Sequence, residues 1–434
     1  MNELVLFGVT GDLAKQKLIP ALFKLYKNGE LNRKSSFIGF GRKKFTKSDF
    51  QNFIEQLVLV GNIDTTNKIS SISLNTHDTH EARSFASQWS YVESELDNLN
   101  GYKKLASILT TDTTLVYISL PPMYQYQVCS TLVSSGIVVK SKNRRIAFEK
   151  PYGFDSISAN KLDSFLTRRL RTDQILRVDH YAGKQALVEF EQVARQGIFS
   201  DILNSKNIKK IEVRLNESID VAKRGPFYDQ VGALSDVGQN HVLHMLATVL
   251  ALPEISVAPS NLSELRSSAL SILEINKKSI LGQYQSFTAT PGVREGSTTE
   301  TFFRIFGKIK AVKSTKVNGK REGKGGKNKS YLNDLSKRWV GLNIEIMGGK
   351  ALSSPEASIT LHTKHSKPVK IMVNGYGSRD AYEQIFIDSF KYNPDRFIDF
   401  KQIEIGWDII EKVKKMASKK VIIYKRGSYP QDIF

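Results

Sequence analysis

The chain has 434 residues, of which 40% are hydrophobic and 24% charged, and its formal net charge is +20. This length and composition exclude a disordered chain and favour two globular domains over one. A single cysteine, Cys129, excludes an internal disulfide and is typical of a reducing compartment. No apolar run approaches the roughly 20 residues of a membrane span, and no export signal is recognisable, so we expect a cytoplasmic protein without a membrane partner.

The positive charge is concentrated in one segment. Residues 308–329 hold nine Lys or Arg residues against one acid, Glu322, so eight of the twenty net charges lie there. The segment is rich in glycine and poor in the aromatic residues that stack on nucleic-acid bases. We therefore interpret it as a solvated loop and do not expect a nucleic-acid partner.

The first part of the chain alternates short apolar runs with helical segments. We predict strands at 4–7, 37–40, 115–120 and 146–148. A helix is predicted to begin near Ile19, after a long turn, with Pro20 in its first turn and Asn28-Gly29 at its end. Such alternation is typical of a parallel α/β domain, which we expect over residues 1–175.

The second part has longer strands in which apolar and polar residues alternate. Strand character is found at 208–215, 302–309, 341–346, 357–365 and 368–373, and helices are predicted at 237–250, 380–391 and 402–416. This pattern predicts an antiparallel sheet with helices on one face, and hence an α+β domain over residues 176–434.

A glycine turn follows the first predicted strand. Gly8 and Gly11, three residues apart, would let the backbone approach a pyrophosphate at the start of a helix, although the pattern lacks the third glycine of the full fingerprint. Arg42 follows the second strand, where a basic residue favours the 2′-phosphate of NADP; a solvated basic turn is the alternative. The candidate cofactor residues of the turn are Gly8, Thr10, Gly11, Asp12 and Leu13.

The stretch from Asp179 to Lys184 contains an acid, a histidine, a phenol and an amine in six consecutive residues. His180 and Lys184 are suited to a phosphate dianion, with Tyr181 as a further donor. Asp179 is suited to orienting a distant imidazole, and His241 is the candidate.

Several motifs occur in one order along the chain. They are Gly8–Lys15, Tyr117–Pro122, Glu149–Gly153, Arg177–Lys184, Asp236–His241, Gly296–Thr299, Gly349–Leu352, Asp380–Glu383 and Trp407. In this combination the chain resembles the glucose-6-phosphate dehydrogenase family over almost its whole length, as a divergent member. The resemblance implies a Rossmann-like domain and a larger antiparallel domain, NADP-dependent oxidation of D-glucose 6-phosphate to the 6-phospho-1,5-lactone without a metal, and a homodimer or homotetramer joined through the second sheet.

The resemblance also implies roles for individual residues. His241 matches the base that removes the proton of the C1 hydroxyl, and Asp179 matches the carboxylate that orients this base. The implied substrate-binding residues are Lys150, His180, Tyr181, Lys184, Glu217, Asp236 and Lys350. On the cofactor side the resemblance adds Pro121 and Lys150, and it implies a cis bond between Lys150 and Pro151.

Two departures leave the sugar open. Ser235 stands where the family usually has arginine, and Pro355 stands where a second basic residue is expected, with Lys364 or Lys367 as candidates to compensate. A dehydrogenase for another sugar phosphate on the same scaffold is therefore an alternative. A non-catalytic basic regulatory or nucleic-acid-binding relative is a second alternative, against which the presence of His241 and Asp179 argues.

Overall fold

The computed structural model describes residues 3–61, 76–256, 262–276, 278–312, 325–375, 377, 379–417 and 421–430. By their contacts they form two units, Met1–Val178 with Arg379–Phe397, and Asp179–Ser378 with Ile398–Phe434. A domain boundary at residue 175 stays a prediction, and the sequence did not indicate that residues 379–397 return to the first unit. No helix in these ranges is both long and apolar enough to cross a membrane.

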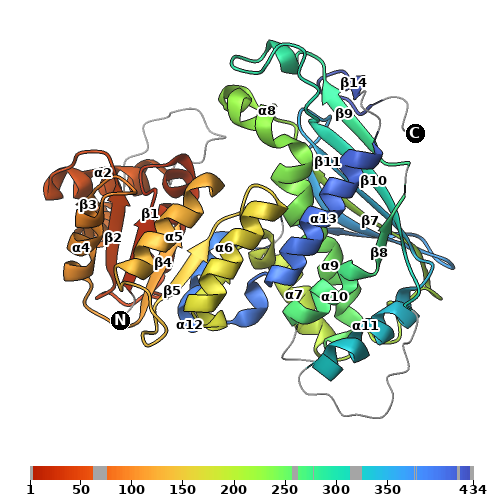
Figure 1. Cartoon of the computed structure of the whole chain (residues 1–434), viewed down its shortest axis with the longest axis horizontal. Coiled ribbons are helices and arrows are strands. Elements are labelled where there is room, and N and C mark those ends of the chain that lie inside the picture. The colour runs from red at the N-terminus through yellow and green to blue at the C-terminus, as the bar shows by residue number, and fades with distance from the viewer. Residues whose placement is uncertain are drawn as a thin grey trace. The chain divides into compact units, whose positions relative to one another are not determined.

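The first unit is built on a six-stranded sheet in the order β3-β2-β1-β4-β5-β6, and every neighbouring pair is parallel (Figure 1). All five residues of β1 are buried, as expected for a central strand covered on both faces. The four predicted strands are confirmed, whereas β3 and β6 were not predicted. The strands are β1 (Glu3–Phe7), β2 (Ser36–Gly41), β3 (Trp89–Glu93), β4 (Thr114–Ile118), β5 (Arg145–Phe148) and β6 (Ile175–Arg177).

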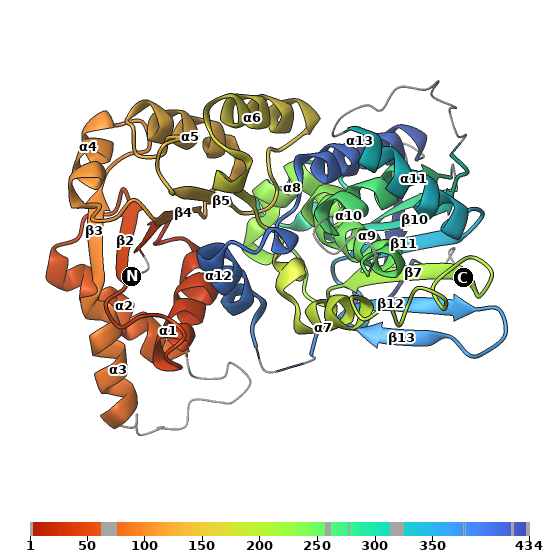
Figure 2. The same ribbon diagram turned by 90° about the horizontal axis from the view of Figure 1, so that it is seen from below.

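Helices cover both faces of this sheet, as in a doubly wound fold (Figure 2). One group is α1 (Ile19–Lys27), α2 (Lys47–Gly61), α3 (Thr76–Ser87) and α12 (Ala381–Lys391); the other is α4 (Leu99–Ile108), α5 (Gln125–Ser134) and α6 (Ser156–Arg169). The helix predicted at 380–391 is α12, with Asp380 as its N-cap. Its place in the first unit corrects our expectation that it belongs with the second sheet.

The connection between β1 and α1 differs from the long turn that we expected. Helix α1 begins at Ile19 and ends before Asn28, as predicted, but the π-helix η1 (Ala14–Leu18) leads directly into it. Pro20 has no N–H to donate to the preceding turn. The π-helical turn η1 precedes Pro20 and accommodates the missing i→i−4 hydrogen bond. The chain therefore becomes helical at Ala14, about one turn before the start that we predicted from Pro20.

The second unit contains an eight-stranded sheet in the order β13-β12-β7-β11-β10-β9-β14, with β8 also pairing to β10. The pairs β7–β11 and β9–β14 are parallel, so the sheet is mixed rather than antiparallel throughout. The two strands of each parallel pair are far apart in the sequence, and the long connection between them lets the second strand run in the same direction as the first. The strands are β7 (Ile208–Asn216), β8 (Leu273–Ile275), β9 (Ile280–Tyr284), β10 (Phe302–Ile309), β11 (Asn343–Gly349), β12 (Glu356–Thr363), β13 (Val369–Met372) and β14 (Ile422–Tyr424).

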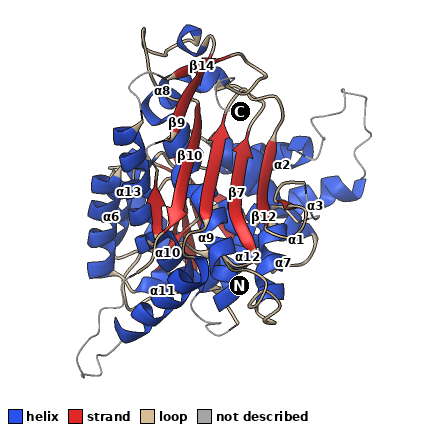
Figure 3. Ribbon diagram, turned by 90° about the vertical axis from the view of Figure 1, so that its right-hand side faces the viewer, coloured by secondary structure: helices blue, strands red, loops and turns tan. Residues whose placement is uncertain are grey.

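Helices pack on one face of this sheet (Figures 2 and 3). They are the π-helix η6 (Leu234–Val242), α9 (Leu243–Ala251), α10 (Leu262–Ser271), α11 (Gly325–Trp339) and α13 (Phe400–Met416); α7 (Gln185–Ala194) and α8 (Gly225–Ala233) complete the unit. Every residue of η6 and α9 is buried, which makes this helical run the centre of the unit's core. Of the basic segment, residues 313–324 lie outside the described ranges, and residues 325–329 begin α11 rather than belonging to a loop.

Candidate active site

The Asp179–Lys184 stretch forms a short 3-10 helix, η4 (His180–Gly183), in the second unit. Asp179 is its N-cap, and the Asp179 Oδ1 atom accepts a hydrogen bond from the Tyr181 backbone N–H at 2.9 Å. This cap fixes the carboxylate at the start of the turn, so the side chains that follow it leave the backbone in set directions.

His241 lies on η6 and meets Asp179 directly. Its Nδ1 atom is 2.5 Å from Asp179 Oδ1, and both side chains are 3% exposed. The wide turn of η6 is held by Asn240, whose side chain accepts from the His241 N–H at 2.7 Å and donates to the Ser235 carbonyl at 3.2 Å. The sequence-predicted pair, 62 residues apart, is therefore brought together.

The charges around Asp179 favour its anionic form. Burial alone would raise its pKa, but the charge and hydrogen bond of His241, with further contributions from His244 and His180, outweigh burial and hold the pKa below the ordinary value. A carboxylate that accepts from Nδ1 leaves Nε2 of His241 as the proton-accepting atom. Asp179, His180 and His241 also bring possible metal-ligand atoms within 4.8 Å of one another. The short Asp179–His241 bond engages Oδ1 and Nδ1, so we interpret the group as a proton-transfer pair.

Two further rings of the stretch pack against the His241 ring, and Lys184 lies over one of them. The ring centroids of His180 and Tyr181 lie 4.3 Å and 4.4 Å from that of His241, and Lys184 Nζ lies 5.6 Å from the Tyr181 centroid. Burial raises the pKa of Tyr181, so its phenol is a neutral donor. Asn374, which sequence reasoning missed, donates to the Tyr181 hydroxyl at 3.5 Å. No motif marks this asparagine, because only the fold brings it near Tyr181.

The predicted acids surround Lys350. Glu217 follows β7 and Lys350 follows β11, and because these strands are parallel neighbours their carboxyl ends meet. The buried Nζ of Lys350 pairs with Glu217 Oε2 and lies 3.7 Å from Asp236 Oδ2. Asp236 is five residues before His241 on η6, so this second group is linked to the first through one helix.

The predicted cofactor residues lie in the first unit, at the carboxyl edge of its parallel sheet. Gly8 directly follows β1 with φ +75°, and a Cβ there would lie 2.3 Å from the Ser119 carbonyl oxygen, so only glycine fits. Gly11 then donates to the Gly8 carbonyl at 2.8 Å, which closes the turn. Because β1 and β4 are adjacent and their connections leave in opposite directions, this is the switch point at which such folds bind ligands. Thr10 and Leu13 are half-buried in the turn, and Gly11 and Asp12 are exposed.

The remaining cofactor candidates border the same edge. Arg42 is exposed directly after β2, and no ion pair of its guanidinium is found within the described ranges. Pro121 is exposed after β4. Lys150 follows β5, and its bond to Pro151 is cis, as predicted. Close backbone approach at Gly8 together with an accessible cation at Arg42 fits a dinucleotide that carries a 2′-phosphate.

The two departures from the family pattern have different outcomes. Lys414 Nζ, from α13, donates to Ser235 Oγ at 3.3 Å. Pro355 is exposed, and Lys370 Nζ lies 2.8 Å from Oε1 of the adjacent Glu356, whereas Lys364 and Lys367 lie elsewhere. In the β7–β12 register Glu356 faces Asn216 while Thr363 faces Ile208, so both lysines follow the opposite end of β12, about 25 Å away along the strand.

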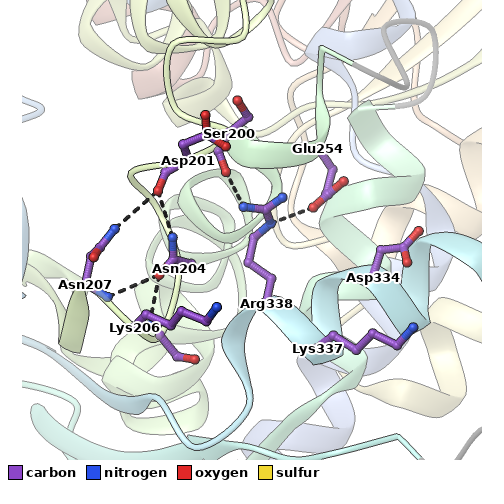
Figure 4. A pocket seen from close by; sticks show the side chains of 10 residues that line it. Ser200, Asp201, Asn204, Lys206, Asn207, Glu254, Asp334, Lys337 and Arg338 are labelled. Atoms are coloured by element: carbon purple, nitrogen blue, oxygen red, sulfur yellow. Dashed lines mark hydrogen bonds and ion pairs between the residues drawn. The ribbon is translucent and has the colours of Figure 1, made fainter.

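A separate pocket of about 730 Å³ opens at the amino end of β7 (Figure 4). Arg338 lies at its centre and is held by Glu254, with 2.6 Å between Nε and Oε1. None of the sequence-predicted site residues lines this pocket, and Glu217 lies at the other end of β7. Its lining is Ser200, Asp201, Asn204, Ser205, Lys206, Asn207, Glu254, Asp334, Lys337 and Arg338.

Comparisons with known proteins show which family the chain resembles in sequence and fold. Residues 5–188 match the profile "Glucose-6-phosphate dehydrogenase, NAD binding domain", and residues 194–318 match "Glucose-6-phosphate dehydrogenase, C-terminal domain". Glucose-6-phosphate 1-dehydrogenase of Bacillus subtilis is 25% identical and that of Borreliella burgdorferi 28%, each over 98% of this chain and 94% of the relative. A solved glucose-6-phosphate dehydrogenase in complex with its substrate has a TM-score of 0.80 at 22% identity and covers 100% of this chain and 96% of its own; it shows the shared fold.

Proposed function

Because the chain belongs to the glucose-6-phosphate dehydrogenase family, we propose that it oxidises D-glucose 6-phosphate at C1 to 6-phospho-D-glucono-1,5-lactone, with NADP as cofactor. The observation that carries this proposal is the buried 2.5 Å bond between His241 Nδ1 and Asp179 Oδ1. A base of this kind is what the oxidation of an alcohol requires, because hydride leaves carbon only as negative charge develops on oxygen.

In the proposed mechanism His241 Nε2 takes the proton of the C1 hydroxyl. The anionic Asp179 stabilises the imidazolium that forms and holds the ring in the tautomer that carries its proton on Nδ1. NADP, when bound, would supply the hydride acceptor for this oxidation. The alcohol thus loses one proton to His241 and one hydride to the cofactor, and C1 becomes the lactone carbonyl.

The remaining residues of the second unit bind the sugar phosphate in this proposal. His180, Tyr181 and Lys184 donate to the 6-phosphate; the packing of His180 and Tyr181 on the His241 ring and of Lys184 over Tyr181 supports this role. Glu217 and Asp236 accept from sugar hydroxyls, because Lys350 offsets their charge and leaves carboxylate lone pairs for the ligand.

The first unit binds NADP in this proposal. The turn from Gly8 to Leu13, with Thr10, Gly11 and Asp12, holds the pyrophosphate, and Arg42 pairs with the 2′-phosphate. Pro121 and Lys150 complete the proposed cofactor site of this unit. The positive φ of Gly8 and the exposure of Arg42 support this assignment.

A panel of glucose, galactose and glucosamine 6-phosphates tests the proposal, with NADP and NAD and the absorbance of the reduced cofactor as the signal. We expect the highest kcat/KM for glucose 6-phosphate with NADP. His241→Asn should lower kcat by about 10²–10⁴ while changing KM modestly. A higher kcat/KM for another sugar phosphate would favour the alternative substrate that Ser235 and Pro355 suggest. Near wild-type turnover of His241→Asn would show that His241 is not the base.

We also propose a cytoplasmic homodimer or homotetramer joined through the sheet of the second unit. Its helix-free face carries a paired charge ladder, in which Lys210 Nζ lies 3.0 Å from Glu212 and 2.7 Å from Glu345. Because this face is internally neutralised rather than strongly charged, a second copy can approach it without net repulsion. Light scattering of the purified chain measures the assembly, and a monomer at micromolar concentration would contradict it.

A further inference from the structure

The helix that carries Asp236 and His241 has an unusual N-terminus. Gly232, with φ +70°, lies just before η6, and a Cβ there would lie 2.3 Å from Glu300 Oε1. The buried Glu300 carboxylate occupies the space that this glycine leaves, and its Oε1 atom accepts from the Leu234 N–H at 3.0 Å. Glu300 thus acts as a cap supplied from a distant part of the chain, at the end of the helix that favours negative charge.

A cation on α13 approaches the same turn that Glu300 caps. Lys414 contributes a positive charge that lowers the Glu300 pKa, although burial dominates and leaves that pKa raised. The same ammonium donates to Ser235 Oγ at 3.3 Å, one residue beyond the capped Leu234. Helix α13 is packed directly on η6, since a Cβ at Gly406 would lie 2.8 Å from the Gln239 carbonyl oxygen. The side chain of the exposed Lys414 therefore reaches the first turn of η6 through this hydrogen bond.

We propose that Glu300 and Lys414 form a positioning pair for η6, in which the carboxylate anchors the first turn and the ammonium supplies its counter-charge. The pair acts through Asp236 and His241 and touches neither sugar nor cofactor. What the helix does in catalysis rests on the proposed function, whereas the anchoring itself does not.

The pair has a defined pH signature. A carboxylate whose pKa is raised on folding destabilises the fold while it is ionised, and this cost disappears as pH falls through the folded-state pKa. Removing Lys414 raises the Glu300 pKa further, so the loss of stability should be largest near neutral pH and shrink towards acid. Tyr228 on α8 also faces Glu300, but its pKa is raised well above the ordinary value, so the phenol stays neutral throughout this window.

Five variants of the full-length protein test the pair. Lys414→Met removes the cation and Lys414→Arg keeps it. Lys415→Met, at the next residue of the same helix and equally exposed, is the matched control. Glu300→Gln removes the need for a counter-charge while its amide oxygen still accepts from Leu234. The double variant Lys414→Met/Glu300→Gln completes a double-mutant cycle, which measures the coupling between the two residues. Readouts are kcat and KM for glucose 6-phosphate, KM for NADP, thermal stability from pH 5 to 8, and hydrogen exchange of residues 233–243.

We expect Lys414→Met to lower kcat about tenfold, to leave the KM for NADP unchanged, and to speed exchange at the start of η6. Lys414→Arg and Lys415→Met should match wild type, and adding Glu300→Gln to Lys414→Met should restore activity and remove the pH-dependent loss of stability. Additive losses of activity and stability in the double variant would contradict the proposed coupling of Glu300 and Lys414. Unchanged hydrogen exchange of residues 233–243 in Lys414→Met would contradict it as well. A wild-type protein inactive on glucose 6-phosphate would instead refute the proposed function, and exchange and stability would still decide the pair.

Discussion

Asp179 joins two features of the candidate site in one carboxylate. Its Oδ1 atom both caps η4 through the Tyr181 N–H and bonds His241 Nδ1. The cap fixes where the carboxylate lies, and the imidazole bond transmits that position to the proposed base. A single side chain therefore connects the backbone of the proposed phosphate-binding turn with the proton-transfer step.

Replacing the Asp179 carboxylate by an amide removes its negative charge and keeps the size of the side chain. We expect Asp179→Asn to lower kcat by about 10²–10⁴, because the amide stabilises neither the required tautomer nor the imidazolium. The folded-state pKa of Asp179 is depressed, so its ionisation stabilises the fold above the ordinary carboxyl pKa of 3.8 and this contribution is lost as pH falls below it. The stability gap between wild type and variant should therefore be present at pH 6 and narrow in strong acid. A gap that widens with acid, measured by thermal unfolding, would contradict this assignment.

Arg42 offers a test on the cofactor side. We expect Arg42→Ala to raise the KM for NADP by about 10-fold or more and to change the KM for NAD little, since only NADP carries the 2′-phosphate. Lys44→Ala, another exposed cation in the same turn, is the control for a general loss of positive charge. An equal rise in the KM for NADP and for NAD, measured by steady-state kinetics, would contradict the assignment of Arg42 to the 2′-phosphate.

At the scale of elements, the sequence predicted what depends on local pattern. Apolar runs located β1, β2, β4 and β5, and alternation located β7 and β10–β13. Strands β6, β8 and β14 have three residues each, too few to show a period, and their partners are distant in sequence. The Asp179–His241 pairing followed from matching residue types, whereas Asn374, Glu300 and Lys414 lie in no motif and reach the site only through tertiary packing.

The glycine turn after β1 can be tested against a matched position. Gly8→Ala should cost about 1–3 kcal/mol and weaken NADP binding, because the new Cβ meets the Ser119 carbonyl oxygen and φ is +75°. Gly29→Ala places the same strain at φ +72° with no atom within 4 Å, so it isolates the backbone term. Thermal unfolding and NADP titration measure both variants. Equal losses of stability and of NADP affinity in Gly8→Ala and Gly29→Ala would mean that the close approach of Gly8 to Ser119 is unimportant.

At the scale of the molecule, the first unit is not a continuous piece of chain. Helix α12 returns to it from the C-terminal part and contributes Ile385 and Phe386, both fully buried, to its core. Ion pairs bind the returning segment, with Lys24 3.0 Å from Glu383 and Arg379 2.9 Å from Glu30. The sequence predicted the helix but not its unit, because an amphipathic pattern shows which face is buried and not against which sheet.

Fragments should reveal this dependence. We expect residues 1–178 alone to unfold at low temperature and to bind NADP poorly, because the surface covered by α12 is left exposed to water. Joining residues 379–397 through a flexible linker should restore both properties, and the same fusion with Phe386→Ser should not. Circular dichroism melting and NADP titration measure the outcome; a stable fragment 1–178 would show that α12 is dispensable.

The return of α12 also sets the order of events during synthesis. The first unit's last segment ends at Phe397, so its core cannot close when Val178 leaves the ribosome. At about 5–20 residues per second, the intervening 219 residues (397 − 178) take about 10–45 s to translate. During that interval the nascent sheet exposes the apolar surface that α12 will cover. The N-terminal unit therefore completes its core late, although its first residues are made first.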